Sequence, residues 1–241
     1  MNGRYFLIVL LALFVTGCHK PSGQARFHFT FSVDGKKLEL DTMMYQNAAG
    51  NRYEISDAQY FISNVVLTNA KGEQYTIKSD TGAHYVDFDV PRTLVWTPTD
   101  DIPAGVYTSI SFVFGLTPEL NKTGTFPNSP ENSMSWPASL GGGYHFLMIN
   151  GKWKDPNGQM KPFNLHTGNY QADNSFVVTL PLANREISKN LITDFVIDMN
   201  INKWFESPNL FNFNEYGGNI MQNQTAQAIL KANGWDVFEI H

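Results

Sequence analysis

The chain has 241 residues, with 22 Asp and Glu against 17 Lys and Arg, which gives a formal net charge of −5 at pH 7. This acidic balance argues against nucleic acid as a partner, because phosphate binding depends on clustered Lys and Arg. Aromatic residues make up 14% of the chain, enough for a sizeable hydrophobic core, and one large domain is the simplest organisation.

The first 17 residues predict a bacterial lipoprotein signal peptide. Arg4 supplies one positive charge, and the apolar run at residues 5–15 is shorter than the ~20 residues that a spanning helix needs. The letters VTGC at residues 15–18 resemble a lipobox, in which cleavage precedes a cysteine that carries diacylglycerol. Cys18 is the only cysteine in the chain, so it has no partner for an internal disulfide. The alternative to a lipid-modified Cys18 is a buried free thiol. We expect an exported protein of the bacterial cell envelope, anchored through lipid on Cys18 to a membrane facing the periplasm or the cell surface.

After a short polar tether at residues 18–25, alternation of apolar and polar residues predicts strands. Residues 26–33 alternate without a break, Asp34 and Gly35 supply a turn, and residues 37–40 resume the pattern. The domain at residues 26–241 is therefore expected to open with a hairpin. Further strands are expected, in chain order, at residues 60–68, 75–77, 84–90, 107–115, 144–149, 163–166, 175–182 and 191–200.

Two further segments complete the predicted organisation. Apolar residues at helical spacing in residues 219–232, followed by Asn233 and Gly234 as a stop, predict a short C-terminal helix. Residues 117–143 are rich in Pro, Asn, Ser and Gly and predict a long loop, and such loops are usually functional or disordered. Many short strands with turn signals between them and a single helix indicate an all-β fold, an antiparallel β-sandwich.

Two histidines that follow the long loop are candidate metal ligands. If Pro156 and Asn157 form the centre of a turn, strand pairing sets His145 opposite Gly168 and His166 opposite Leu147. The two imidazoles would then be diagonal neighbours on one face. Neutral imidazoles that converge are good ligands for copper, zinc or iron. The alternative is that both histidines occupy the solvated face of a hairpin.

Other residues are possible additions to this pair. His28, on the polar face of the first strand, is a candidate third ligand, and the thioether of Met134 suits copper(I). Trp136 lies two residues after Met134 and offers an indole that can be oxidised or can cover a metal. The alternative is a structural role, in which the side chains of Met134 and Trp136 pack into the end of the sandwich. The common catalytic motifs of hydrolases, metalloproteases and nucleotide-binding enzymes are absent from the sequence, so we do not expect an enzyme.

Several segments together resemble the MbnP-like copper-binding family, which is named for a periplasmic protein associated with methanobactin, a copper-chelating peptide. The resemblance extends over nearly the whole mature chain and rests on the order and spacing of its motifs. These motifs are FSVDGKKL at residues 31–38, AQYFISNVVL at 58–67, GVY at 105–107, FVFGL at 112–116, MSW at 134–136, GYHF at 143–146, FNLHTG at 163–168, NINKWF at 200–205 and the segment 220–238.

The resemblance implies a β-sandwich outside the cytoplasm that is not an enzyme and that, in some members, binds copper through histidines. In some members a tryptophan is oxidised to kynurenine by a partner dihaem cytochrome c peroxidase, and Trp136 is the matching position here. His166 matches a family histidine, whereas His145 stands where members vary. Ser32 replaces a histidine that some members have, and Ala138 replaces a second tryptophan.

Two functional hypotheses follow. The first is a lipid-anchored protein that binds copper through His145 and His166, with help from His28 or Met134 and with Trp136 adjacent. The second is a metal-free β-sandwich module whose Trp and Tyr side chains bind a glycan or an envelope protein.

Overall fold

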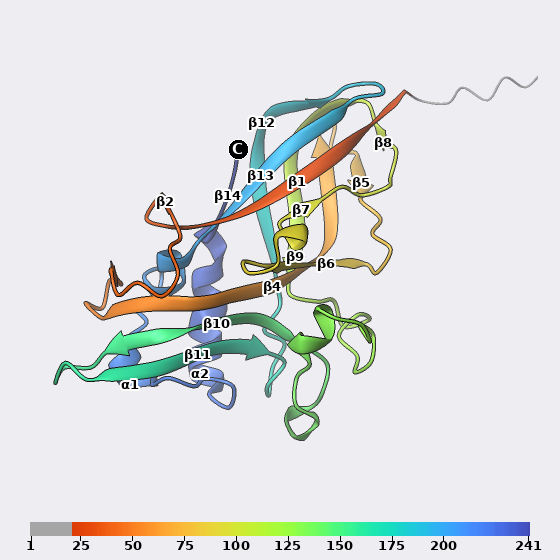
Figure 1. The fold of residues 1–241 in the computed structure, drawn as a ribbon. Helices are drawn as coiled ribbons and strands as arrows, with labels where there is room; N and C mark the ends of the chain where they lie inside the picture. The colour runs from red at the N-terminus through yellow and green to blue at the C-terminus, as the bar shows by residue number, and fades with distance from the viewer. Residues whose placement is uncertain (1–20) are drawn as a thin grey trace, which may run out of the picture.

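The structure is a computed structural model that describes residues 21–241, so the predicted signal peptide and the lipid site at Cys18 lie outside the described residues. Two β-sheets pack against each other in the described part (Figure 1), which confirms the all-β sandwich expected from the strand pattern.

The smaller sheet is built around the first strand. Its strands, in spatial order, are β14 (Phe238–Ile240), β13 (Ile192–Asn200), β1 (Ser22–Val33) and β2 (Lys36–Lys37), with β7 (Val95–Trp96) and β8 (Ile102–Pro103) also pairing with β1. β1 pairs with β13 in parallel, whereas its pairings with β2, β7 and β8 are antiparallel. The sheet is therefore mixed, although its hairpins follow the predicted antiparallel pattern.

The larger sheet is antiparallel and contains both candidate histidines. Its strands, in spatial order, are β11 (Met160–Gly168), β10 (His145–Lys154), β4 (Arg52–Asn69), β9 (Gly105–Phe114) and β12 (Phe176–Ile187), with β3 (Tyr45–Gln46), β5 (Gln74–Thr76) and β6 (Ala83–Asp87) also pairing with β4. β4 is long enough to pair with five other strands, so it is the central strand of this sheet.

The predicted N-terminal hairpin is present, but its first strand is longer than expected. Asp34 and Gly35 have positive φ angles and join β1 to β2. β1 begins at Ser22, four residues before the predicted start at Arg26, because Ser22 and Gly23 pair with β8. Residues 22–25 of the predicted polar tether are thus already strand.

The main core lies between the sheets and is strongly aromatic. Alternate residues of β1, among them Phe27, Phe29 and Phe31, are buried, as the period-two pattern predicts. From the other sheet, Phe114 packs against Trp204, with ring centroids 5.1 Å apart. Each such side chain contributes about 1.5–3 kcal/mol when it is fully buried.

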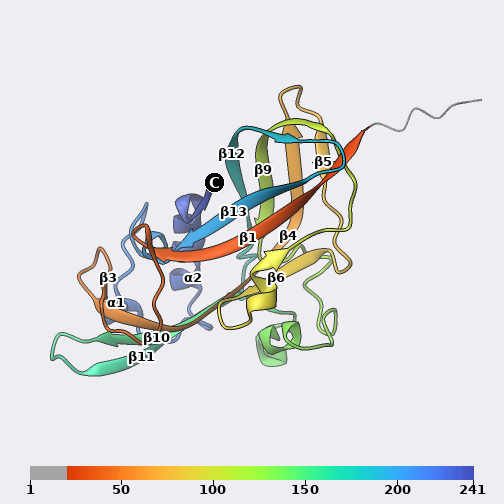
Figure 2. The same cartoon turned by 45° about the horizontal axis from the view of Figure 1, so that its top comes forward.

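A second, smaller cluster covers the outer face of β4. Phe61 of β4 is fully buried although it points away from the main core, because the 117–143 loop folds over it. Phe126 stacks on Phe61 at 5.1 Å between ring centroids, and the hydroxyl of Tyr144 accepts a hydrogen bond from the backbone N–H of Phe126. In Figure 2 this loop, drawn in green, lies below β4 and β6. The long loop is therefore a packed layer, and it includes the short 3₁₀ turns Glu131–Met134 and Ala138–Leu140.

The predicted C-terminal helix is present as α2 (Gln224–Asn233), which a 3₁₀ turn at Gly234–Asp236 extends. It starts five residues later than expected, because the side chain of Asn223 accepts a hydrogen bond from the backbone N–H of Ala226 and so caps the helix. A one-turn helix, α1 (Phe213–Tyr216), was not predicted.

Candidate metal centre

The two candidate histidines lie on the β10–β11 hairpin, at the end that adjoins the long loop. His145 pairs with Gly168, as predicted, although the strands next to the turn are one residue out of the predicted register, with Lys154 opposite Met160. A β-bulge after His145 then shifts the register, so that Met148, and not Leu147, lies opposite His166. The predicted partner of His166 was therefore wrong by one residue.

The bulge has a packing cause at Phe146. Phe146 joins the outer cluster, while Leu147 belongs to the main core, so both are fully buried. A Cβ atom on Gly115 would lie 2.6 Å from the Phe146 ring, so only glycine admits this position of the ring. The predicted meeting of the two imidazoles still occurs: the ring centroids of His145 and His166 are 5.1 Å apart, with their planes at 89°.

His145 is held in one tautomer by the main chain. Its Nδ1 lies 2.9 Å from the carbonyl oxygen of Met134, and a carbonyl oxygen only accepts, so Nδ1 carries the proton. The lone pair is then on Nε2, which is buried and has no hydrogen-bond partner among the described residues. An imidazole fixed through one nitrogen, with the other nitrogen free, is the usual state of a metal-binding histidine.

His166 is held in the opposite tautomer by a chain of side chains. Its Nε2 lies 2.8 Å from Oδ1 of Asn150. The Nδ2 group of Asn150 donates to the carboxylate of Asp57 at 3.1 Å, which fixes the orientation of the amide. Nε2 of His166 must therefore donate, and its lone pair is on Nδ1. Gln59 also donates to Asp57, at 2.6 Å, and keeps the carboxylate in place.

Burial keeps both imidazoles neutral. Burial lowers the pKa of His145, and the hydrogen bond to Met134 only partly opposes this effect. Burial, and then repulsion from His145, lower the pKa of His166 from 6.5 to about 4. Both rings are thus unprotonated at neutral pH, as ligation of a metal requires.

Trp136 forms the third side of this cluster. It is almost fully buried, with its ring centroid 4.7 Å from that of His145 and the two planes at 71°. Its Nε1 donates to the carbonyl oxygen of Leu140 at 3.2 Å. A Cβ atom on Gly168 would lie 2.7 Å from the indole, so the ring packs directly on the glycine backbone.

The backbone of Gly168 is in turn fixed from the C-terminal side. Its N–H donates to Oε1 of Gln227 in α2, at 3.1 Å, and its carbonyl oxygen accepts from Asn174 at 2.7 Å. The C-terminal helix therefore supports the strand position on which Trp136 lies.

The other two candidate ligands are not brought to the histidine pair as side chains. His28 lies in the other sheet, where its Nε2 contacts the carboxylate of Asp194 at 2.7 Å. Met134 is fully buried with the outer cluster, and the group that it presents to His145 is its carbonyl oxygen. Within residues 21–241, no group of three or more His, Cys, Asp or Glu is arranged to hold a metal ion.

Sequence reasoning missed Asp57, Asn150 and Met148 as parts of the site. Asp57 pairs with Asn150 across β4 and β10, and Met148 pairs with His166 across the hairpin. The alternation of Met148 and Asn150 along β10 is a usable signal only when the bulge after His145 is known. A groove of about 570 Å³ beside the β1–β2 hairpin is lined by other residues, among them Phe31, Lys37 and Asp198, and does not include the histidines.

The fold defines a β-sandwich protein in which two neutral imidazoles and an indole meet at the end of one hairpin. The sequence model of the MbnP family matches residues 22–223, and the chain belongs to this family. The family is associated with methanobactin and copper, and its proteins are exported.

A solved structure supports the same fold. MbnP from Methylosinus trichosporium aligns with a TM-score of 0.55 and 16% sequence identity, covering 78% of this chain and 79% of that one. Among curated proteins, no sequence matches the chain. No helix within residues 21–241 is long and apolar enough to cross a membrane.

Proposed function

We propose that this chain is a lipoprotein of the cell envelope, attached through Cys18, that binds one copper ion at His145 and His166 beside Trp136. The observation that supports the proposal most is Nε2 of His145, which is buried, unprotonated and without a hydrogen-bond partner among the described residues. Burial of such an atom costs free energy unless a partner compensates, and a metal ion is such a partner.

The donor set fits copper better than zinc. Two neutral imidazoles suit copper, and Met148, the cross-strand neighbour of His166, is a residue type that copper(I) accepts as a ligand. Zinc sites in proteins normally have three or four protein ligands, more than this hairpin offers. Nε2 of His145 and Nδ1 of His166 would hold the ion, and bound copper would supply a redox-active centre next to an indole.

Trp136 is the residue that we propose is oxidised, by a partner such as a dihaem cytochrome c peroxidase. Its place against His145 supports this role, because an oxidised ring there would change the surroundings of the metal. We further propose that the chain acts by binding and not as an enzyme. Intact mass of protein from the native host tests the modification, and an unmodified Trp136 there would contradict it.

The copper proposal is tested by metal retention. The purified full-length protein is loaded with copper, desalted and analysed for metal, and we expect about one copper per chain. His145→Ala and His166→Ala should lose it. His28→Ala is the matched control, because His28 is a histidine of the other sheet, and it should retain copper. A wild-type protein without copper after desalting, or equal loss in all three variants, would refute the site.

One observation favours the metal-free module. Trp235 has 66% of its surface exposed and borders a groove of about 540 Å³ that Phe176 and Lys231 also line. An exposed indole beside polar groups can stack on a sugar ring. Glycan-array binding that a chelator leaves unchanged and that Trp235→Ala abolishes would support this function.

A further inference from the structure

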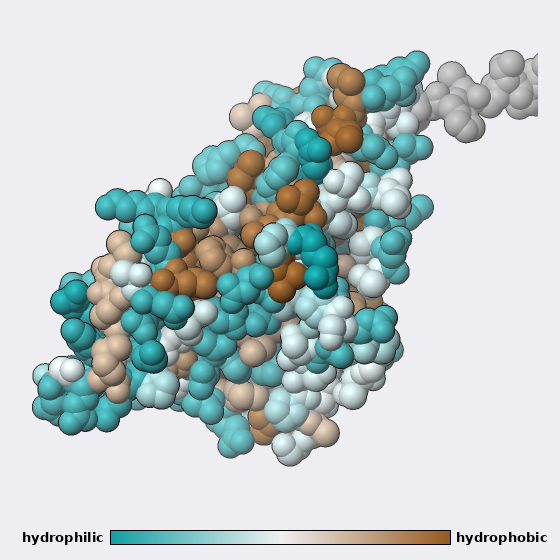
Figure 3. Space-filling model, in the orientation of Figure 1, coloured by the Kyte–Doolittle hydropathy of each residue, from teal (hydrophilic) through white to brown (hydrophobic). Residues whose placement is uncertain are grey.

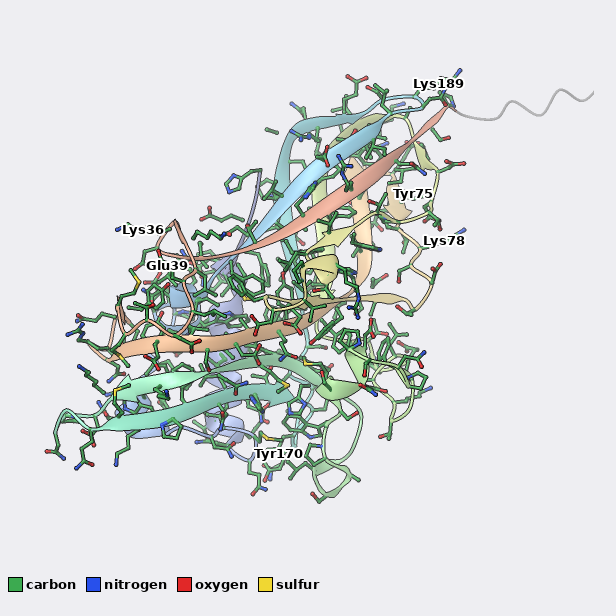
Figure 4. The ribbon with its side chains drawn as sticks, viewed as in Figure 1. Lys36, Glu39, Tyr75, Lys78, Tyr170 and Lys189 are labelled. Carbon is green, nitrogen blue, oxygen red and sulfur yellow. The ribbon has the colours of Figure 1, made fainter. Side chains whose placement is uncertain are left out.

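Three exposed hydrophobic side chains lie at the end of the molecule where the described chain begins. Leu191 is 61% exposed and Ile192 46%, at the turn between β12 and β13, and Val106 on the adjacent β9 is 43% exposed. Lys189 is exposed at the tip of the same turn, and Figure 4 shows it beside the start of β1. Figure 3 shows hydrophobic residues at this end of the molecule.

The first described residues are clamped against this turn. The backbone N–H of Asn190 donates to the carbonyl oxygen of Ser22 at 2.8 Å, and that of Gln24 donates to Leu191 at 2.9 Å. Gly23 lies so close to the carbonyl oxygen of Ser188 that no Cβ atom fits between them. The start of the strand therefore has a fixed position beside Leu191.

The position of Cys18 limits how far this end can be from a lipid anchor. Cys18 lies three residues before Pro21, whose carbonyl oxygen accepts a hydrogen bond from Ala104 at 2.7 Å. Three residues extend over at most about 10 Å. Lipid on Cys18 would thus bring the membrane surface within reach of the turn, whatever the path of the chain between.

We propose that residues 188–192, together with Val106, form a membrane-contacting surface whose occupant is the lipid bilayer; this inference rests on the proposed lipid anchor at Cys18. Single exposed apolar residues are common on protein surfaces, but these three lie at the end of the molecule where the described chain begins, three residues after the proposed anchor at Cys18. Leu191 and Ile192 enter the interfacial region, and Lys189 keeps its ammonium group at the level of the lipid headgroups.

This surface would orient the metal centre. In Figure 4, Tyr170, two residues after Gly168, lies at the opposite end of the molecule from Lys189. With residues 188–192 on the membrane, the His145 and His166 pair faces the aqueous compartment. A soluble electron-transfer partner then reaches Trp136 without competing with lipid.

The test uses spin labels on the full-length lipoprotein, reconstituted in vesicles of phosphatidylethanolamine and phosphatidylglycerol. Because lipid occupies Cys18, Leu191→Cys introduces one labelling site, and Ile192→Cys gives a second position. Val177→Cys is the matched control: Val177 is 67% exposed and lies ten residues before Ile187 on the same strand, roughly 33 Å away. Relaxation is measured with oxygen, which concentrates in lipid, and with a water-soluble nickel complex.

We expect labels at 191 and 192 to be accessible to oxygen and protected from nickel, and the label at 177 to show the reverse. Intact mass separates the two proposals. A protein that carries lipid but whose labels at 191 and 192 are as nickel-accessible as that at 177 overturns the membrane-contacting surface and leaves the anchor standing. A mass without lipid overturns both.

Discussion

One added methyl group at Gly168 tests whether the packing of Trp136 sets the geometry of the metal centre. Gly168 lies directly opposite His145 and has no positive φ angle, so its backbone accepts alanine. The new Cβ atom would lie 2.7–2.9 Å from three carbons of the indole, closer than real Cβ contacts. Because Trp136 is buried and its ring lies against His145, we expect displacement of the indole to press on His145.

The expected cost follows from these contacts. Overpacking of a well-filled core costs about 1–3 kcal/mol. Replacing glycine by alanine also makes the unfolded chain less flexible, which raises the free energy of unfolding by about 0.4–1 kcal/mol. We therefore expect Gly168→Ala to lower the free energy of unfolding by about 1–2 kcal/mol. Displacement of His145 should also weaken copper binding about tenfold, a change of about 1.4 kcal/mol.

A double-mutant cycle with Trp136→Leu, which removes the clashing ring atoms, isolates this effect. The free energy of unfolding of the metal-free wild type, both single variants and the double variant is measured by urea denaturation. We expect Gly168→Ala to be nearly neutral when Trp136→Leu is present, which gives a coupling energy of about 1–2 kcal/mol. Additive effects, or a Gly168→Ala variant with unchanged stability and copper affinity, would refute the packing argument.

Three further predictions concern His166, His84 of β6, which lies outside the site, and Asn150. Because the pKa of His166 is lowered to about 4, copper retention measured by competition with a chromogenic chelator should stay constant from pH 7 to about 5, and a midpoint near 6.5 would contradict this. Burial also lowers the pKa of His84 to about 4, so between pH 6.5 and 4 the unfolded chain binds protons that the folded chain does not. The Tm of the metal-free protein should therefore fall as the pH drops from 6.5 toward 4. A Tm that rises over this range would contradict the prediction. Asn150→Leu should weaken copper binding about 10- to 100-fold and alter the ¹⁵N NMR tautomer signature of His166, whereas Asn164→Leu, at the paired position on β11, should do neither.

Local patterns were sufficient to predict most strands and the general position of the site. The alternation in residues 26–33, the turn at Asp34 and Gly35, and the hairpin that joins β10 to β11 all depend on near neighbours. The two imidazoles meet as expected, because both lie on one hairpin with a short turn. The family resemblance is confirmed over most of the chain.

The rest depends on contacts that are remote in sequence. The bulge at Phe146 exists because the outer cluster has space for the Phe146 ring. The sequence around Phe146 does not predict this space. The tautomer of His166 depends on Asp57, which is 93 residues before Asn150. The 117–143 loop has few apolar residues, yet Phe126 and Met134, with Leu120 packed beside them, hold it onto β4.

The parallel pairing of β1 with β13 has a consequence for folding kinetics. Arg26 of β1 pairs with Asp194 of β13, 168 residues later in the chain. β1 is synthesised first, but it cannot form this pairing until β13 has been synthesised. Closure of so long a segment is slow compared with the formation of hairpins such as β10–β11. Until β13 arrives, β1 presents an open edge that can pair with another chain. β1 therefore depends for its completion on one of the last strands of the chain.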